Sequence, residues 1–226
     1  MMEIAGKTIE LFPPRTPGAP LVVLNTVMGE GTATYTAIAG ATDADFALAA
    51  IGNLDWNDDL SPWPCEPVFK GDGGFGGGAD RYLSLLTGKL LPKIIDALPA
   101  PPKYVALAGY SLAGLFALYA PHHTDVFDRV ASASGSTWFP GFVEYVKTHP
   151  MARVPGRVYL SVGDREARTK NAVMRPVEDN ARALAAWYRE RGIASTFVLD
   201  PGGHFKDAEA RVARAVAWII SEGDDV

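Results

Sequence analysis

One serine of this chain lies in a context typical of a catalytic nucleophile. Ser111 stands between Gly109 and Ala113 in the stretch YVALAGYSLAGLFALYA, residues 104–120. In a G-x-S-x-G nucleophile elbow, a strand, a sharp turn and a helix follow directly, and small residues two before and two after the serine let strand and helix approach each other. Alanine at the second of these places is a mild departure, because a methyl group is the smallest side chain after hydrogen. A membrane span is excluded, since about 20 apolar residues are needed and Gly-Tyr-Ser interrupts this run.

A serine nucleophile needs a base, and His204 is the best placed of the four histidines. It lies in the turn DPGGHF, directly after an apolar strand pattern and before the last helical pattern. Loops at the carboxyl ends of parallel strands are where open α/β sheets build their sites. The remaining three follow or precede prolines in polar connections and are expected on the surface: His122, His123 and His149.

The third member of such a site is a carboxylate that orients the histidine, and two candidates follow the preceding strand pattern. Gly163 ends that pattern, and Asp164 and Glu166 come directly after it. The order serine, acid, histidine is the one found in α/β hydrolases. We favour Glu166, because the orienting acid commonly falls three residues beyond the glycine. Asp164 stays as the alternative, or as a residue that holds the turn through backbone hydrogen bonds.

Backbone N–H groups must stabilise the oxyanion that forms in the reaction. Leu112 should supply one of them, because it directly follows the nucleophile. The second should come from the loop after the apolar run 21–25, at Thr26 or Val27.

The substrate pocket is expected under a long connection, residues 53–79, which is rich in Trp, Pro and Gly and has no periodicity. Long loops in compact proteins are usually functional or disordered. Its aromatic residues argue against disorder, and they are Trp56, Trp63, Phe69 and Phe75. Trp138, which follows another strand pattern, is a further pocket candidate, although a packed core position would suit it equally. The Gly71-x-Gly73-x-x-Gly76 pattern matches a dinucleotide fingerprint by letter, but the apolar run before it is too short for a Rossmann strand.

The strands and helices that position these residues are predicted by alternating strand and helix patterns. Apolar strand patterns cover 7–12, 21–25, 46–52, 104–108, 129–133, 157–162 and 195–199, and helical patterns cover 34–41, 80–98, 112–120, 139–148, 177–191 and 206–221. Apolar strands that alternate with helices predict an α/β fold with a mostly parallel central sheet covered on both faces. No linker or repeat divides the chain, so residues 1–226 are expected to form one domain without a large cap.

The composition excludes several classes of protein. With 226 residues and 48% hydrophobic residues the chain can bury a large core, so disorder is excluded. A net charge of −5 with no basic cluster excludes nucleic acid and anionic membranes as expected partners. No apolar segment follows the first charges and Cys65 is the single cysteine, so a cytoplasmic location is expected. No spacing of His and Cys indicates a metal, and Cys65 has no histidine near it in sequence.

The elbow, GDRE after the next-to-last strand and PGGHF near the end together resemble the esterase family of α/β hydrolases that holds esterase D, enterobactin-type siderophore esterases and mycolyltransferases. SPWPCEPVFK and SASGSTWFPGF are similar to loops of its small bacterial members. The resemblance covers about residues 21–218 and implies an α/β-hydrolase fold and hydrolysis of a small-molecule ester without a cofactor. It also implies that Ser111, Glu166 and His204 match the catalytic positions.

Three alternatives stay open at this point. The same residues would serve acyl transfer to an alcohol, if the aromatic loop excludes water. A siderophore trilactone is a second substrate class, but no arginine pattern for siderophore contact is present. A non-catalytic binding protein is the third alternative, because fold does not fix function.

Overall fold

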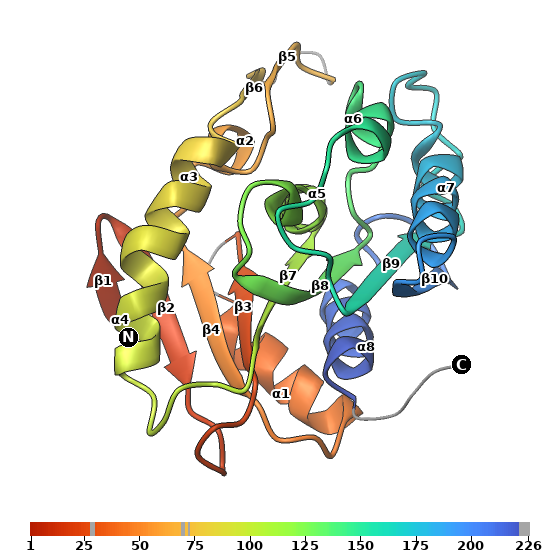
Figure 1. Ribbon diagram of the computed structural model, residues 1–226. Helices are drawn as coiled ribbons and strands as arrows, with labels where there is room; N and C mark the ends of the chain where they lie inside the picture. Colours follow the sequence, from red (N-terminus) through yellow and green to blue (C-terminus); the bar gives the residue numbers. More distant parts are fainter. Residues whose placement is uncertain (28–29, 69–70, 72, 222–226) are drawn as a thin grey trace.

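The computed structural model describes residues 1–27, 30–68, 71 and 73–221, which form one eight-stranded sheet with helices on both faces (Figure 1). The sheet has the order β1-β2-β4-β3-β7-β8-β9-β10. The strands β1 and β2 pair antiparallel, as do β2 and β4, and every other neighbouring pair is parallel. Their bounds are β1 Met2–Ile4, β2 Lys7–Phe12, β3 Leu21–Asn25, β4 Ala47–Gly52, β7 Val105–Tyr110, β8 Phe127–Ala133, β9 Arg157–Gly163 and β10 Ala194–Asp200.

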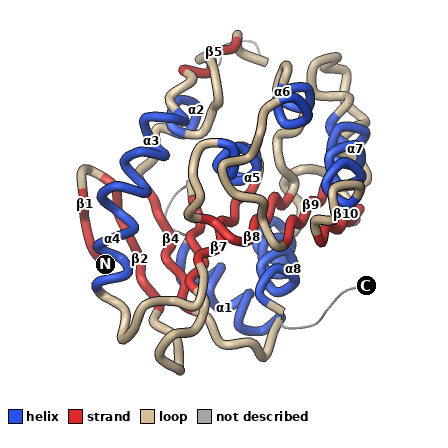
Figure 2. Tube along the Cα trace, viewed as in Figure 1, coloured by secondary structure: helices blue, strands red, loops and turns tan. Residues whose placement is uncertain are grey.

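The central strands are apolar throughout because both of their faces are buried. Along β3, Leu21 and Val23 point into one core, and Val22 and Leu24 point into the other. The core on the side of Val22 is closed by α1 (Gly31–Ala41) and α8 (Ala208–Ile220). The core on the other side is closed by α3 (Ala79–Leu85), η1 (Leu86–Leu90), α4 (Leu91–Asp96), α5 (Leu112–Tyr119), α6 (Phe142–Thr148) and α7 (Val177–Arg189). Figure 2 shows the sheet in red between these two helical layers. The mostly parallel, doubly covered sheet expected from the sequence is confirmed.

All seven strands expected from the sequence are present, and their ends differ by at most two residues. The structure adds β1, which pairs only at the sheet edge, and the short 3-10 helix η2 (Ala120–His122). It also adds three short elements inside the long connection, namely α2 (Trp56–Asp59) and a hairpin of β5 (Pro64–Cys65) and β6 (Phe75–Gly76). These elements are too short to show a periodic pattern. The connection makes no separate cap domain in the residues that the structure describes, and Phe69 lies outside them.

The parallel strands bring distant loops to one edge of the sheet. Gly109 pairs with Asn25 on one side and with Ser132 on the other, and Asp200 pairs with Gly163. The loops that follow these strands therefore lie side by side, as expected for the carboxyl edge of an α/β sheet. Within the described residues, no helix has the length and apolar character to cross a bilayer.

Candidate active site

Ser111 occupies a strained turn between β7 and α5. Its backbone angles are φ 57° and ψ −120°, a region that residues other than glycine rarely adopt and that costs about 1–3 kcal/mol. The turn is held on both sides, because the N–H of Ser111 donates to the carbonyl of Ala133 (3.1 Å) and its own carbonyl accepts from the N–H of Ser136 (3.0 Å). The close approach of strand and helix requires Gly109, where an added Cβ would lie 2.7 Å from the Cβ of Ala113.

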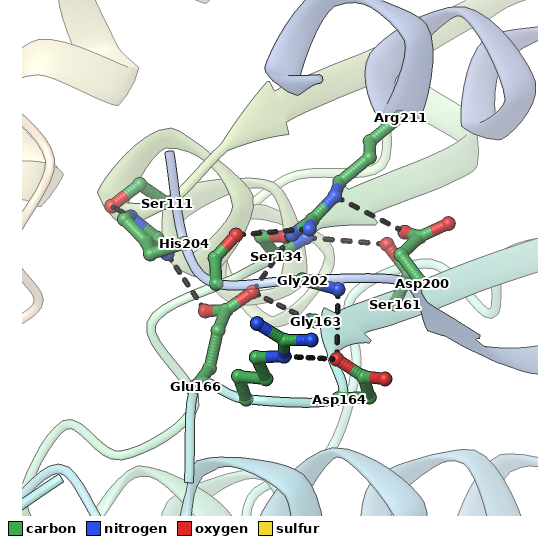
Figure 3. Close-up of polar contacts among 12 residues, drawn as sticks. Ser111, Ser134, Ser161, Gly163, Asp164, Glu166, Asp200, Gly202, His204 and Arg211 are labelled. Atoms are coloured by element: carbon green, nitrogen blue, oxygen red, sulfur yellow. Dashed lines mark hydrogen bonds and ion pairs between the residues drawn. The ribbon is translucent and has the colours of Figure 1, made fainter. Parts of the chain in front are cut away.

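The hydroxyl of Ser111 begins a chain of two hydrogen bonds (Figure 3). Its Oγ lies 3.0 Å from Nε2 of His204, and Nδ1 of the same ring lies 2.7 Å from Oε2 of Glu166. With the proton on Nδ1, the imidazole donates to the carboxylate and its Nε2 is free to accept the serine proton. A hydroxyl, a base and an orienting acid in this order can carry out nucleophilic catalysis.

Glu166 is buried and yet kept ionised. Its side chain is 6% exposed, and burial alone would raise its pKa. The hydrogen bond and the charge interaction with His204, together with the N–H of Gly163 that donates to Oε1 at 2.6 Å, outweigh burial, so that the pKa of Glu166 lies below its ordinary value. Oε1 also accepts from Nη1 of Arg211 at 3.0 Å. A carboxylate that stays charged can orient His204 and stabilise its protonated form.

Asp164 has a different environment. Its Oδ1 accepts a hydrogen bond from the N–H of Gly202 at 2.7 Å, and its own N–H donates to the carbonyl of Asp200 at 2.8 Å. These bonds tie the loop after β9 to the loop after β10. The structure thus brings Glu166 to His204 and places Asp164 at the joint between the two loops (Figure 3).

The position of His204 is also supported from the elbow. The hydroxyl of Tyr110, the last residue of β7, donates to the carbonyl of His204, and the two rings lie 5.3 Å apart. Burial raises the pKa of Tyr110, so the phenol remains a neutral donor at ordinary pH.

The three proposed oxyanion donors differ in their surroundings. Leu112 begins α5, where the first N–H groups of a helix have no partner inside the helix. The N–H of Thr26 is already used, because it donates to the carbonyl of Ile51 at 2.8 Å and so extends the sheet. Val27, which is 53% exposed, lines a cavity at Ser111. The second donor is therefore best sought at Val27.

Two cavities adjoin Ser111 and His204. One has a volume of about 300 Å³ and is mainly apolar, with Leu24, Val27 and Val212 in its wall. The other has about 230 Å³ and is lined by Phe75, Trp138, Met174 and Ser136 among others. Trp56 and Phe205 belong to both walls, so Trp56 lies between the two cavities.

Trp63 does not line either cavity. Its Nε1 donates to the carbonyl of Pro140 at 3.1 Å, and its ring packs against Phe139 and Tyr145 at centroid distances of 5.8 and 5.3 Å. The expected place of Trp63 in the pocket is therefore not seen, because the ring anchors the long connection to the segment before α6. Trp56 and Trp138, by contrast, do line the cavities.

The other candidate groups lie away from this site. His122, His123 and His149 gather around Tyr145 instead. Burial raises the pKa of the Cys65 thiol, which disfavours the reactive thiolate. Among the described residues, no group of three His, Cys, Asp or Glu side chains is arranged to hold a metal ion.

Three polar residues of the site were not expected from the sequence. Ser136 places its Oγ 3.4 Å from Oγ of Ser111, Tyr110 holds the histidine loop, and Arg211 contacts Glu166. Arg211 had a signal: in helical spacing it shares a face with Ala215 and Ile219, where a charged residue is unexpected.

Comparisons with known proteins identify the family of the chain. A family model described as "Putative esterase" matches residues 29–204, which is more than half of the chain. The chain belongs to this esterase family. A relative from Bacillus subtilis, the uncharacterized protein YbbA, is 27% identical over 138 residues, which are 60% of this chain and 55% of the relative. The match thus spans only about half the length of that relative.

Solved structures of similar fold cover nearly the whole chain. The siderophore hydrolase EstA from Aspergillus nidulans has a TM-score of 0.74 at 20% identity, over 95% of this chain and 89% of the other. The enterobactin esterase from Shigella flexneri has a TM-score of 0.68 at 21% identity, over 94% of this chain and 55% of the other. The expected α/β-hydrolase fold is confirmed.

Proposed function

We propose that this esterase hydrolyses a small carboxylic ester through an acyl-enzyme on Ser111. His204 removes the hydroxyl proton while Oγ of Ser111 attacks the ester carbonyl. Glu166 orients His204 and balances the charge that the ring acquires. The N–H groups of Leu112 and Val27 stabilise the oxyanion of the tetrahedral intermediate.

The rest of the reaction has two stages. The proton on Nε2 of His204 passes to the leaving alcohol, and the acyl group stays on Oγ of Ser111. A water molecule, deprotonated by the same nitrogen, attacks the acyl-enzyme. The proton then passes from Nε2 to Oγ of Ser111 as the acyl–oxygen bond breaks, and the carboxylic acid is released. The two cavities at Ser111 would receive the two sides of the ester, one for the acyl part and one for the alcohol part.

The observation that carries the proposal is the unbroken chain from Oγ of Ser111 through His204 to Glu166, at 3.0 and 2.7 Å. The strained backbone of Ser111 supports it, because such strain persists where a site requires it. A binding protein on this fold would need neither feature. Acyl transfer to an alcohol uses the same residues and remains a same-chemistry alternative.

A siderophore lactone is the second candidate substrate, because the names of two similar structures describe a siderophore hydrolase and an enterobactin esterase. Among the described residues that line the two cavities there is no Arg or Lys. Anionic ferric catecholates would find no counter-charge on these walls, so we favour uncharged esters. The cytoplasmic location and the single-domain organisation remain predictions.

The test is labelling with a fluorophosphonate probe, followed by mass spectrometry of the labelled peptide. We expect one label on Ser111 of the wild type, none on Ser111→Ala, and turnover of p-nitrophenyl acetate by the wild type alone. An uncharged ester panel, a tricatechol lactone and an added alcohol acceptor then separate the substrate classes. Near-normal activity in a folded Ser111→Ala variant would contradict the proposed mechanism.

A further inference from the structure

Arg211 is fully buried in the interior of the protein. It lies on α8, is 0% exposed, and is one of the largest fully buried side chains among the described residues. Its neighbours on the helix, such as Ala215 and Ile219, pack against the sheet. A buried guanidinium is costly unless its donors and its charge are matched. Its partners therefore indicate why a cation is placed here.

These partners come from three loops at the carboxyl edge of the sheet (Figure 3). Nη1 donates to Oγ of Ser134, after β8, at 2.7 Å and to Oε1 of Glu166, after β9, at 3.0 Å. Nη2 donates to the carbonyls of Pro201 and Gly203, after β10, at 3.1 and 2.9 Å. One planar group thus holds the acid of the site and the turn that carries His204.

The contacts with Glu166 fix the plane of its carboxylate and turn one oxygen toward His204. Oε1 accepts from Arg211 and from the N–H of Gly163, so that Oε2 is left for Nδ1 of His204. The space is also closely filled, because an added Cβ at Gly163 would lie 2.9 Å from Nη2 of Arg211. The carboxylate therefore has one orientation in which both oxygens are satisfied.

The charges of this cluster balance. Arg211 faces the carboxylates of Glu166, through Nη1, and of Asp200, whose Oδ2 lies 3.8 Å from Nε. Asp200 also pairs with Arg214 at 2.5 Å. Among the described residues, the titratable groups next to the cluster include His204, Asp164, Tyr110 and Tyr159, and burial raises the pKa of both tyrosines. With a neutral His204 the two arginines and two carboxylates sum to zero.

We propose that Arg211 is a positioning residue for the esterase reaction. It joins Glu166 to the histidine turn through a single guanidinium, and its permanent charge, 3.0 Å from Oε1, adds to the interactions that favour the ionised Glu166 carboxylate while His204 shuttles the proton. It touches no substrate, so it acts through Glu166 and His204. Lysine would keep the charge but cannot present a planar fork to four acceptors. The proposal rests on the proposed function.

The test compares Arg211→Met and Arg211→Lys with Arg214→Met as the matched control. Arg214 lies on the same helix and pairs with Asp200, but it is half exposed and no described contact joins it to Glu166 or to His204. Two readouts are used over a range of pH: the rate of fluorophosphonate labelling of Ser111, and kcat and KM for p-nitrophenyl acetate. Circular dichroism checks that each variant is folded.

We expect Arg211→Met to lower kcat and the labelling rate at least tenfold, while KM changes by less than threefold. The acid side of the profile of kcat against pH should move to higher pH. Loss of the cation makes Glu166 easier to protonate, which gives this direction. Arg211→Lys should lower kcat but keep the acid side in place, and Arg214→Met should resemble the wild type. A purely structural role would lower the amount of folded protein without moving the profile.

The outcomes separate the two proposals. If the wild type itself is not labelled, the proposed function fails. If the wild type is labelled and folded Arg211→Met matches Arg214→Met in rate and pH profile, the role of Arg211 is overturned. Should Arg211→Met not fold, Arg211→Lys decides, because full kcat in the lysine variant would show that the guanidinium fork is not needed.

Discussion

A hydrogen bond joins Asp164 to Gly202 across two neighbouring loops, in which the N–H of Gly202 donates to Oδ1 of Asp164 at 2.7 Å. Gly202 has a φ of 100°, a conformation that glycine adopts readily. The bond fixes this bend two residues before His204. Asp164 therefore acts on the shape of the turn, whereas Glu166 contacts the imidazole itself.

This difference predicts that two conservative substitutions affect different properties, catalysis in one case and stability in the other. Glu166→Gln should lower kcat for p-nitrophenyl acetate by about 10³–10⁴-fold, as for the acid of other triads. Asp164→Asn keeps an oxygen acceptor for Gly202, so we expect kcat within about tenfold and a lower melting temperature. Steady-state kinetics and thermal unfolding of both variants check this. The reverse ranking of the two kcat values would assign the acid to Asp164.

The lowered pKa of Glu166 predicts a pH-dependent contribution to stability. Because the pKa is lower in the folded state, the ionised group stabilises the fold fully above the ordinary carboxyl value of about 4.3 and loses this contribution as the pH falls through the folded value. The difference in free energy of unfolding between wild type and Glu166→Gln should thus be largest near neutral pH and narrow in acid. Urea unfolding between pH 3 and 7 measures it. A difference in free energy of unfolding that grew as the pH fell would contradict the lowered pKa of Glu166.

Trp56 and Trp63 form a matched pair for testing the pocket. Trp56 borders both cavities, so Trp56→Ala should change the ratio of kcat/KM between p-nitrophenyl butyrate and acetate by about tenfold, equivalent to ~1.4 kcal/mol. Trp63→Ala should leave that ratio unchanged and lower the melting temperature, since the ring packs on Phe139 and Tyr145. If Trp63→Ala shifted the ratio more than Trp56→Ala, the placement of Trp56 in the pocket wall and of Trp63 outside it would be contradicted.

The contact at Gly109 predicts that a single methyl group there damages the elbow. An added Cβ would lie 2.7 Å from the Cβ of Ala113, and overpacking of this kind costs about 1–3 kcal/mol. Gly109→Ala should lower both the melting temperature and the rate of fluorophosphonate labelling. Gly40 in α1 is the control, because an added Cβ meets no atom within 4 Å there and alanine favours a helix by about 0.5–1 kcal/mol. Equal melting temperatures for the two variants would contradict the packing argument.

The elements that position the site could be predicted because their signals are local. The apolar run 21–25, the small residues beside Ser111 and the glycine-rich turn at His204 each reveal a strand, an elbow or a loop without knowledge of the rest of the chain. The parallel sheet then brings these loops to one edge. The preference for Glu166 over Asp164 came from spacing alone, and the contact with His204 supports it.

The remaining features depend on contacts between distant residues. Thr26 could not be separated from Val27 in the sequence, because only the pairing of β3 with β4 shows that the N–H of Thr26 is used. Trp63 shares its composition and loop with Trp56, and its direction is decided by Pro140, 77 residues away. The role of Arg211 could likewise not be predicted, because in the sequence it is only a charged residue on a mostly apolar helix face. Its partners lie in three loops that the fold brings around it.

The dependence of the site on α8 has a consequence for biosynthesis. This helix follows every strand of the eight-stranded sheet in the sequence, yet its Arg211 contacts both Glu166 and the histidine turn. Chains fold from the N-terminus as they leave the ribosome. A nascent chain with all eight strands emerged would therefore lack the contacts of Arg211 with Glu166 and the histidine turn, and the proposed site would be complete only when residues 208–220 had cleared the exit tunnel and docked.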